Sequence, residues 1–126
     1  MNKEVKTVLA PKAIGPYSQA IKANNTIYVS GQLGLNPITN DFDKDDIVTQ
    51  TKQSLNNIKA ILESEGYSME DVVKTTVLLK DINDFKEMNE IYNTFFNEPF
   101  PARAAFEVVA LPKGGRVEIE AIAVRS

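Results

Sequence analysis

The segment that decides the fold is PARAAFEVVALPKGGRVEIEAIAV, residues 101–124. It contains two strand-like runs, residues 102–111 and 116–124, and the turn PKGG between them predicts a β-hairpin. Side chains of the second run alternate between the two faces of the strand, which places Glu118 and Glu120 together on a partly apolar face. The segment therefore predicts two strands of one sheet, one of which carries a pair of carboxylates.

Arg103 is the only cation in the first of these runs, where alanines and phenylalanine surround it. A guanidinium is always charged and costly to desolvate, so it needs a partner. One candidate is an internal ion pair with a glutamate: Glu107, Glu118 or Glu120. The other is a small carboxylate ligand, which the planar guanidinium can hold by two parallel hydrogen bonds. The residues alone leave both alternatives open.

Two helices are predicted upstream of this segment. In residues 46–65 apolar or small side chains recur at helical spacing, and Gly66 follows where a C-cap is expected. The second predicted helix is residues 84–96, in which Asp84 and Glu87 match the pattern of a capping box ahead of an apolar face. The segment between the two helices is therefore expected to be a strand.

Two β-prone runs, residues 24–35 and 68–82, complete the set of elements, and the second opens with a short capped turn. The order strand, helix, strand, helix, strand, strand predicts an α+β fold with two helices on one face of a single mixed sheet. No composition shift marks a second domain, so residues 1–126 form one domain. Apolar side chains occupy both strand faces, and we therefore expect a homo-oligomer in which another copy covers the free face.

The composition excludes several kinds of chemistry. The chain has 126 residues, a net charge of -3 and neither cysteine nor histidine. Thiolate catalysis and cysteine zinc sites are therefore impossible, and any chemistry must use carboxylates, Tyr, Ser, Lys, Arg, backbone groups and water. The basic residues are scattered singly, which argues against nucleic-acid binding. Because we find neither a signal-peptide pattern nor an apolar run of the ~20 residues that span a bilayer, we expect a cytoplasmic location.

Two other motifs are better explained as loops. DFDKDD, residues 41–46, resembles the start of a calcium loop, but Asp46 stands where that loop needs glycine and Lys52 where it needs a bidentate carboxylate. LPKGGR, residues 111–116, lacks the Gly-Lys-Ser/Thr ending of a phosphate-binding loop. We therefore predict neither a metal site nor a phosphate site.

Two glycine-containing stretches have both a structural and a functional interpretation. GPYSQAI, residues 15–21, is a turn before a strand, and Tyr17 is either an ordinary half-buried aromatic residue or part of a site. In VSGQLG, residues 29–34, Gly31 either marks a β-bulge or lets a ligand approach the backbone.

Five stretches together resemble the RidA/YjgF family of reactive-intermediate deaminases, also called the endoribonuclease L-PSP family: AIGPYSQAI, VSGQLGLNP, TKQSLNNIKAIL, VVKTTVLLKDINDF and PARAAFEVVALPKGGRVEIEAIAV. The resemblance spans nearly the whole chain. It implies a homotrimer of chorismate-mutase-like subunits with a barrel-like centre and active sites in the clefts between neighbours. It also implies hydrolysis of 2-imino acids and enamines, such as 2-aminoacrylate, 2-iminobutanoate and 2-iminopropanoate, to 2-keto acids and ammonium. The resemblance further implies that pyridoxal-phosphate dehydratases supply these substrates and that the reaction uses no cofactor and no metal.

The resemblance also assigns roles to individual residues. Arg103 is expected to bind the substrate carboxylate, Glu118 to position the attacking water, and Tyr17 to line the pocket with its hydroxyl. With Arg103 close by, the pKa of Glu118 should stay low unless burial offsets the cation. Further contacts with the substrate are expected from Ser30, Gly31 and Asn89.

One position departs from the family pattern. Many relatives have a cysteine two residues after the arginine, where this chain has Ala105. Thiol-based activity is therefore not expected, whereas imine hydrolysis needs no thiol. Two alternatives from other classes remain at this point: a non-catalytic small-ligand binder that contacts a regulatory protein partner, and a translation-inhibiting endoribonuclease.

Overall fold

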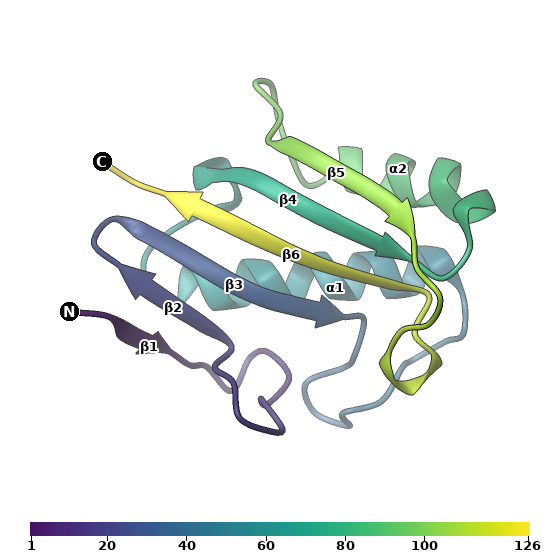
Figure 1. The fold of residues 1–126 in the computed structure, drawn as a ribbon, viewed down its shortest axis with the longest axis horizontal. Helices are drawn as coiled ribbons and strands as arrows, with labels where there is room; N and C mark the ends of the chain where they lie inside the picture. Colours follow the sequence, from purple (N-terminus) through teal and green to yellow (C-terminus); the bar gives the residue numbers. More distant parts are fainter.

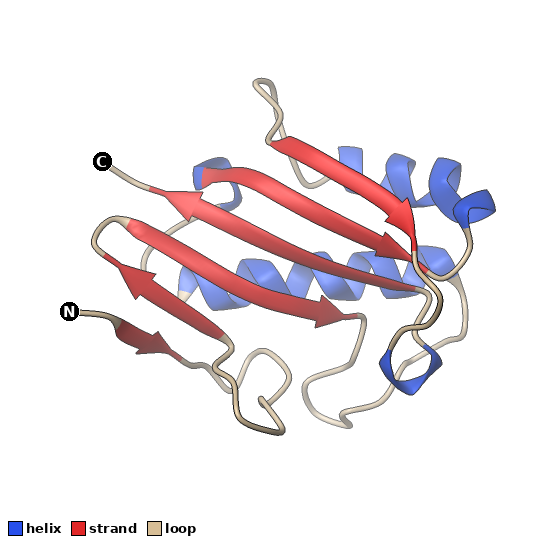
Figure 2. Ribbon diagram, in the orientation of Figure 1, coloured by secondary structure: helices blue, strands red, loops and turns tan.

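Both α-helices lie on one face of a six-stranded sheet in the computed structural model, which describes residues 1–126 (Figures 1 and 2). The strands are β1 (Lys3–Val5), β2 (Ala20–Ala23), β3 (Thr26–Leu33), β4 (Val72–Leu79), β5 (Ala102–Glu107) and β6 (Val117–Val124). The α-helices are α1 (Ile47–Glu63) and α2 (Phe85–Asn93), and the short 3-10 turns are η1 (Met69–Asp71), η2 (Ile82–Asp84) and η3 (Pro112–Gly114). The predicted α+β fold with one mixed sheet is confirmed.

The strand order is β1-β2-β3-β6-β4-β5, and β4 and β5 are the only parallel pair. The predicted hairpin between β5 and β6 is therefore wrong, because β4 lies between these two strands (Figure 1). Helix α2 connects β4 to β5, as parallel neighbours require a crossover connection. The PKGG stretch does form a turn, η3, but it carries the chain across the end of β4 to the sheet centre.

Helix α1 follows its sequence pattern closely. The Asp46 carboxylate accepts a hydrogen bond of 2.6 Å from the Thr49 backbone N–H, which satisfies one of the free donors at the helix start. Gly66 adopts a φ of 76° just past the helix end, a conformation that favours glycine. The predicted boundaries of this helix are confirmed to within two residues.

The predicted capping box of α2 is absent. Asp84 ends the turn η2 with helical dihedral angles and makes no capping hydrogen bond. Its carboxylate instead lies 3.8 Å from the Arg116 guanidinium. A capping box forms instead at η1. The Asp71 carboxylate accepts a hydrogen bond from the Ser68 backbone N–H, and the Ser68 hydroxyl accepts one from the Glu70 backbone N–H.

Polar side chains of α1 bond the backbone where β3 ends. Ser54 donates to the Gln32 carbonyl at 2.7 Å, and the Asn57 amide donates to two carbonyls further along, those of Leu33 and Leu35. These three hydrogen bonds are buried or partly buried, so the groups that make them would be costly to leave unpaired. These bonds fix α1 to the end of β3, beside the region in which Glu118 lies.

The second face of the sheet has no helix over it (Figures 1 and 2). Tyr28 and Val124 are exposed there to 51% and 41%, beside the partly exposed Ile122. The buried core lies between the opposite face and the helices and includes Val77 and Ile119. No helix is long and apolar enough to cross a membrane.

Candidate active site

Arg103 projects toward α2, on the face of the sheet that the helices cover. Its guanidinium carbon lies 4.8 Å from the centre of the Tyr92 ring and 5.4 Å from that of Phe85. Its Nη1 donates a hydrogen bond of 2.7 Å to the Asn89 side-chain oxygen. A cavity of about 530 Å³ opens beside these residues and is also lined by Phe100.

Arg103 forms no ion pair within the chain. Glu107 is on the same strand, but its carboxylate accepts a hydrogen bond from the Ile82 backbone N–H at 2.8 Å. Glu118 and Glu120 lie on the other face of the sheet. The alternative of an internal ion pair is therefore excluded within one subunit, and the guanidinium is available to an external anion.

Glu118 lies on the open face of β6, next to the irregular part of β3. The β3–β6 register shifts between Val29 and Gln32, so Gly31 sits in the predicted β-bulge. A methyl group on Gly31 would come within 2.5 Å of the Glu118 carboxylate oxygen. Glycine at this position therefore makes room for the Glu118 carboxylate, an explanation that does not depend on a ligand.

A second cavity of about 530 Å³ gathers most of the other predicted site residues. Its wall includes Tyr17, Ser30, Gly31, Glu118 and Glu120. Lys12 also lines this cavity but forms no ion pair with either carboxylate.

The electrostatics of Glu118 within one subunit are determined by burial. Burial, with a smaller contribution from the Glu120 charge, raises the pKa of Glu118 above its ordinary value. Arg103 of the same subunit does not offset this shift, because the two side chains lie on opposite faces. Arg103 is in register with the buried Thr75, whereas Glu118 is in register with Leu78 on the other face of β4. Within one subunit, Arg103 and Glu118 do not meet.

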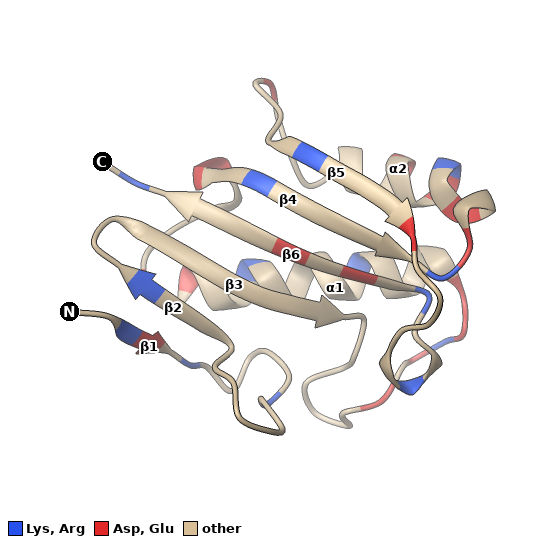
Figure 3. Ribbon diagram, viewed as in Figure 1, with Lys and Arg blue, Asp and Glu red and all other residues tan.

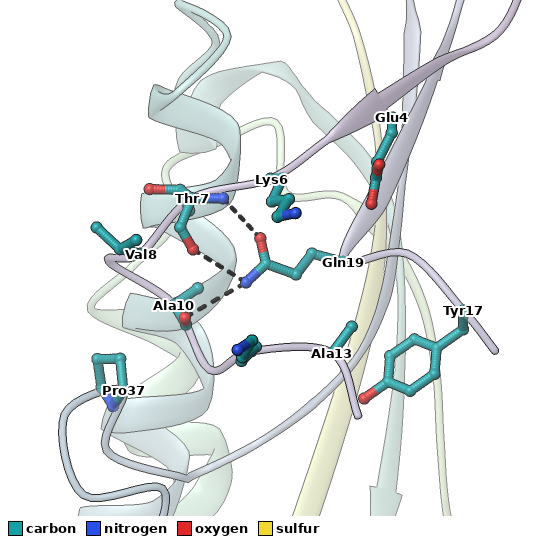
Figure 4. A pocket seen from close by; sticks show the side chains of 10 residues that line it. Glu4, Lys6, Thr7, Val8, Ala10, Ala13, Tyr17, Gln19 and Pro37 are labelled. Carbon is teal, nitrogen blue, oxygen red and sulfur yellow. Dashed lines mark hydrogen bonds between the residues drawn. The ribbon is translucent and has the colours of Figure 1, made fainter. Parts of the chain in front are cut away.

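The irregular segment that carries Tyr17 is held by Gln19, a residue that sequence reasoning did not select. The Gln19 amide accepts from the Thr7 N–H at 2.8 Å and donates to the carbonyls of Thr7, Ala10 and Pro11. Figure 4 shows this amide at the wall of a neighbouring cavity of about 670 Å³, with Tyr17 at its far side. Gln19 is buried, so its bonds define where the segment lies.

Ser30 belongs to the same network. Its hydroxyl donates to the Ser18 carbonyl at 2.6 Å, and its backbone N–H donates to the Gln19 carbonyl at 2.9 Å. The hydroxyl proton is thus already used, and Ser30 can offer a ligand only an acceptor. Tyr17, by contrast, is 53% exposed and its hydroxyl has no partner within the chain.

The structure thus divides the predicted site residues into two groups. Half-site A comprises Arg103 and Asn89, and half-site B comprises Tyr17, Ser30, Gly31 and Glu118. No cluster of three or more acidic side chains is arranged to hold a metal ion. In the acidic loop, Asp45 pairs with Arg116 at 2.8 Å and Asp46 caps α1.

Sequence reasoning missed the partners of Arg103. Phe85 and Tyr92 were assigned only to a helix and its apolar face, yet both rings contact the guanidinium. Their spacing of seven residues, with Asn89 between them, was the available signal, because such residues share one face of a helix.

The fold and the two half-sites define a chorismate-mutase-like α+β subunit with one face of its sheet open. The chain belongs to the endoribonuclease L-PSP family, whose sequence model matches residues 7–125. It is similar to a goat protein named 2-iminobutanoate/2-iminopropanoate deaminase, with 54% identity over 121 residues, which are 96% of this chain and 88% of the relative.

Solved structures of the family superpose closely on the chain. The YjgF gene product from E. coli aligns with a TM-score of 0.93 and 49% identity over 98% of this chain and 99% of that one. E. coli TdcF, solved with bound serine, aligns with a TM-score of 0.93 and 42% identity over the same shares. The similarity therefore extends over the elements that carry both half-sites.

Proposed function

We propose that this protein is an imine deaminase that hydrolyses 2-imino acids and their enamine tautomers to 2-keto acids and ammonium. The observation that carries the proposal is the Arg103 guanidinium, which has no acidic partner and borders a cavity. The names of the curated relatives at 50–54% identity support the same reaction. Its substrates would be 2-aminoacrylate, 2-iminobutanoate and 2-iminopropanoate, released by pyridoxal-phosphate dehydratases.

The complete site is proposed to form between subunits of a homotrimer. Half-site A faces the helices and half-site B faces the open side of the sheet, so one small substrate cannot touch both within a subunit. A neighbour that packs against the open face would bring its own Arg103 toward Glu118. Three such contacts around one axis would close the open faces into a barrel-like centre and give three equivalent sites.

Each residue then has a defined task. Arg103 holds the substrate carboxylate through two parallel hydrogen bonds, and Asn89 keeps the guanidinium in place from its other side. Tyr17 and the backbone at Gly31 contact the imine end of the substrate. Glu118 orients a water molecule over the imine carbon.

The reaction needs no protein nucleophile, because an iminium carbon is already electrophilic. Water adds to this carbon and loses a proton, which gives a carbinolamine. Transfer of a proton to nitrogen then allows the C–N bond to break. As the C=O bond forms, the hydroxyl proton passes to the departing ammonia, so iminium and water become keto acid and ammonium. Glu118 can accept and return this proton, and beside the neighbour's guanidinium its main task is to orient and polarise the water.

The test is a coupled reaction in which a threonine dehydratase generates 2-iminobutanoate. Formation of the keto acid is followed with no added protein, with wild type and with Arg103→Ala. We expect wild type to exceed the spontaneous rate and Arg103→Ala to lose most of that gain. A wild-type rate equal to the spontaneous rate would contradict the enzyme assignment.

A second candidate is a binding protein that uses the same pocket without catalysis. The observation in its favour is that TdcF, a relative of the same fold, was solved with bound serine. Binding of 2-oxobutanoate or serine to wild type that depends on Arg103, together with no acceleration of imine hydrolysis, would support this candidate.

The family description also raises ribonuclease activity. Lys and Arg are spread singly over β1, β2, β4, β5, both α-helices and the loops, and no two of them are adjacent in the sequence (Figure 3). Phosphate-backbone binding depends on clustered cations, so this arrangement favours the imine substrate. RNA cleavage that persists in Arg103→Ala after removal of contaminating nuclease would support the ribonuclease instead.

A further inference from the structure

We propose that Phe85, Asn89 and Tyr92 of α2 form a positioning device for Arg103, which presets the guanidinium for a carboxylate and so determines substrate affinity. The residues are separated by four and three positions and therefore share one face of the helix. Each contacts the guanidinium: the two rings at 5.4 Å and 4.8 Å from its central carbon, and the amide oxygen at 2.7 Å from Nη1. The effect on affinity rests on the proposed function, whereas the positioning itself does not.

The contacts leave part of the guanidinium free. Of its five N–H donors, the hydrogen bond to Asn89 uses one, and the aromatic rings interact with the cation without using any. The remaining donors include a pair that can face a carboxylate side by side. A lysine could not replace this arrangement, because an ammonium has neither the planar fork nor the flat face.

Tyr92 is itself held in place. Its ring is buried, and its hydroxyl lies 2.7 Å from the hydroxyl of the buried Thr75. Thr75 is the β4 residue in register with Arg103 on β5. Burial raises the pKa of the Tyr92 hydroxyl, so the ring stays neutral while it contacts a cation. Arg103 on β5 thus contacts Tyr92, Tyr92 bonds Thr75, and Thr75 lies on β4, the strand next to β5.

A purely structural role would be a simpler explanation, but the ion-pair pattern argues against it. Glu90 lines the same cavity and could neutralise the guanidinium, yet it forms no ion pair with Arg103. The chain thus restrains the position of an exposed cation and leaves its charge without an ionic partner. This combination suits an anion site that must be ready before the ligand arrives.

Three variants of the assembled protein test the device: Tyr92→Leu and Phe85→Leu remove one ring each, and Tyr92→Phe keeps the ring but removes the hydroxyl. Loss of a ring should raise the KM for 2-iminobutanoate and the Kd for 2-oxobutanoate by about 2- to 30-fold, the range expected for a cation–π contact. The kcat should change much less, and Tyr92→Phe should stay within about twofold of wild type because the ring remains.

The matched control is Tyr67→Leu. Tyr67 is also buried, its hydroxyl also has a bonded partner, and its ring also lies near cations, those of Lys22 and Arg125. It lies at neither half-site. This variant should lose stability to a comparable degree while KM and Kd stay unchanged.

A direct readout separates the device from the proposed function. The Arg103 Nε–H, followed by 15N NMR, should exchange with water faster and lose part of its ring-current shift in Tyr92→Leu and in Phe85→Leu but not in Tyr67→Leu. If wild type does not hydrolyse the imine, the proposed function fails and this readout still decides on the device. Unchanged Arg103 resonances and an unchanged Kd in a folded ring-loss variant would overturn the proposal, and Phe85→Leu decides if Tyr92→Leu does not fold.

Discussion

Half-site A and half-site B contrast in charge and in surroundings. Half-site A holds a cation with aromatic and amide neighbours and no carboxylate partner, whereas the cavity at half-site B is lined by the carboxylates of Glu118 and Glu120, with no cation paired to them. They lie on opposite faces of one sheet. Each region carries charge of one sign without an ionic partner, and the two signs are opposite. The contrast teaches that one subunit contains the parts of the proposed site but not the site itself.

The strongest test of this contrast mixes two inactive variants. Arg103→Ala and Glu118→Ala should each lower kcat/KM by about 100-fold or more, since each removes a charged contact with the reacting molecule. Random reassembly of equal amounts should restore about a quarter of the wild-type sites, because a native site needs Arg103 from one subunit and Glu118 from its neighbour. Activity before and after co-refolding is the measurement.

The controls for this experiment are each variant refolded alone, which should remain inactive. If both half-sites served a substrate within one subunit, no mixed assembly would contain a native site. A mixture as inactive as its components would therefore contradict the shared site.

Changing Glu118 alone sharpens the role of half-site B. Glu118→Gln keeps the shape of the side chain but removes the proton acceptor, so kcat should fall by about 100-fold while KM changes little. Steady-state kinetics over a series of pH values measure both quantities, and Glu120→Gln is the matched control on the same face. A normal kcat in Glu118→Gln would exclude Glu118 as the group that activates water.

Gly31→Ala should produce a smaller loss. The added methyl group would come within 2.5 Å of the Glu118 carboxylate, so the carboxylate must rotate away while the strand remains in place. We expect kcat to fall by about tenfold, the penalty of a modest displacement of a catalytic group, with little change in melting temperature. A large drop in melting temperature would instead point to a backbone role for Gly31.

The subtlest test compares pKa values across the two half-sites. Within one subunit, burial and Glu120 raise the pKa of Glu118. If the neighbour's guanidinium lies close in the assembled protein, it favours the ionised form, so Arg103→Ala should raise the pKa of Glu118 relative to wild type. A pH titration followed at the Glu118 carboxyl carbon by 13C NMR measures this difference. Identical pKa values in the two proteins would show that Arg103 and Glu118 do not come together in the assembly.

The raised pKa of Glu118 also makes the stability of the fold depend on pH. Where the folded pKa of Glu118 lies above that of the unfolded chain, the folded state binds more protons. Stability therefore falls as the pH rises from the unfolded pKa through the folded one. In Arg103→Ala, substitution of Glu118 by Gln should thus raise the melting temperature at neutral pH and leave it unchanged well below the unfolded pKa.

The sequence predicted those parts of the fold that depend on local patterns. Helix α1 followed from its spacing and from the Gly66 that comes after it, and the alternation of β6 placed Glu118 and Glu120 on one face. The placement of β5 beside β4 could not be predicted in this way, since a turn such as PKGG is compatible with both a hairpin and a crossover. Strand order depends on packing between distant segments, and local spacing does not contain that information.

For the candidate site, the sequence predicted which residues take part but not how they are arranged in space. The family motifs selected Arg103 and Glu118, but only the sheet order determines that their side chains leave opposite faces. The Asp84 cap failed for a related reason, because Arg116 attracts that carboxylate from across the fold. In each case a contact between residues far apart in the chain outweighed the local pattern.

The central position of β6 also has a consequence for biosynthesis. Strand β6 pairs with β3 along one edge and with β4 along the other, yet it follows both of them in the chain. As the chain is made, both strands must wait with an unpaired edge, which is the state most prone to misassociation. We expect a ribosome-bound chain halted before Val117 to be protease-sensitive and to need protection by chaperones. The strand that supplies Glu118 is thus also the strand whose arrival completes folding.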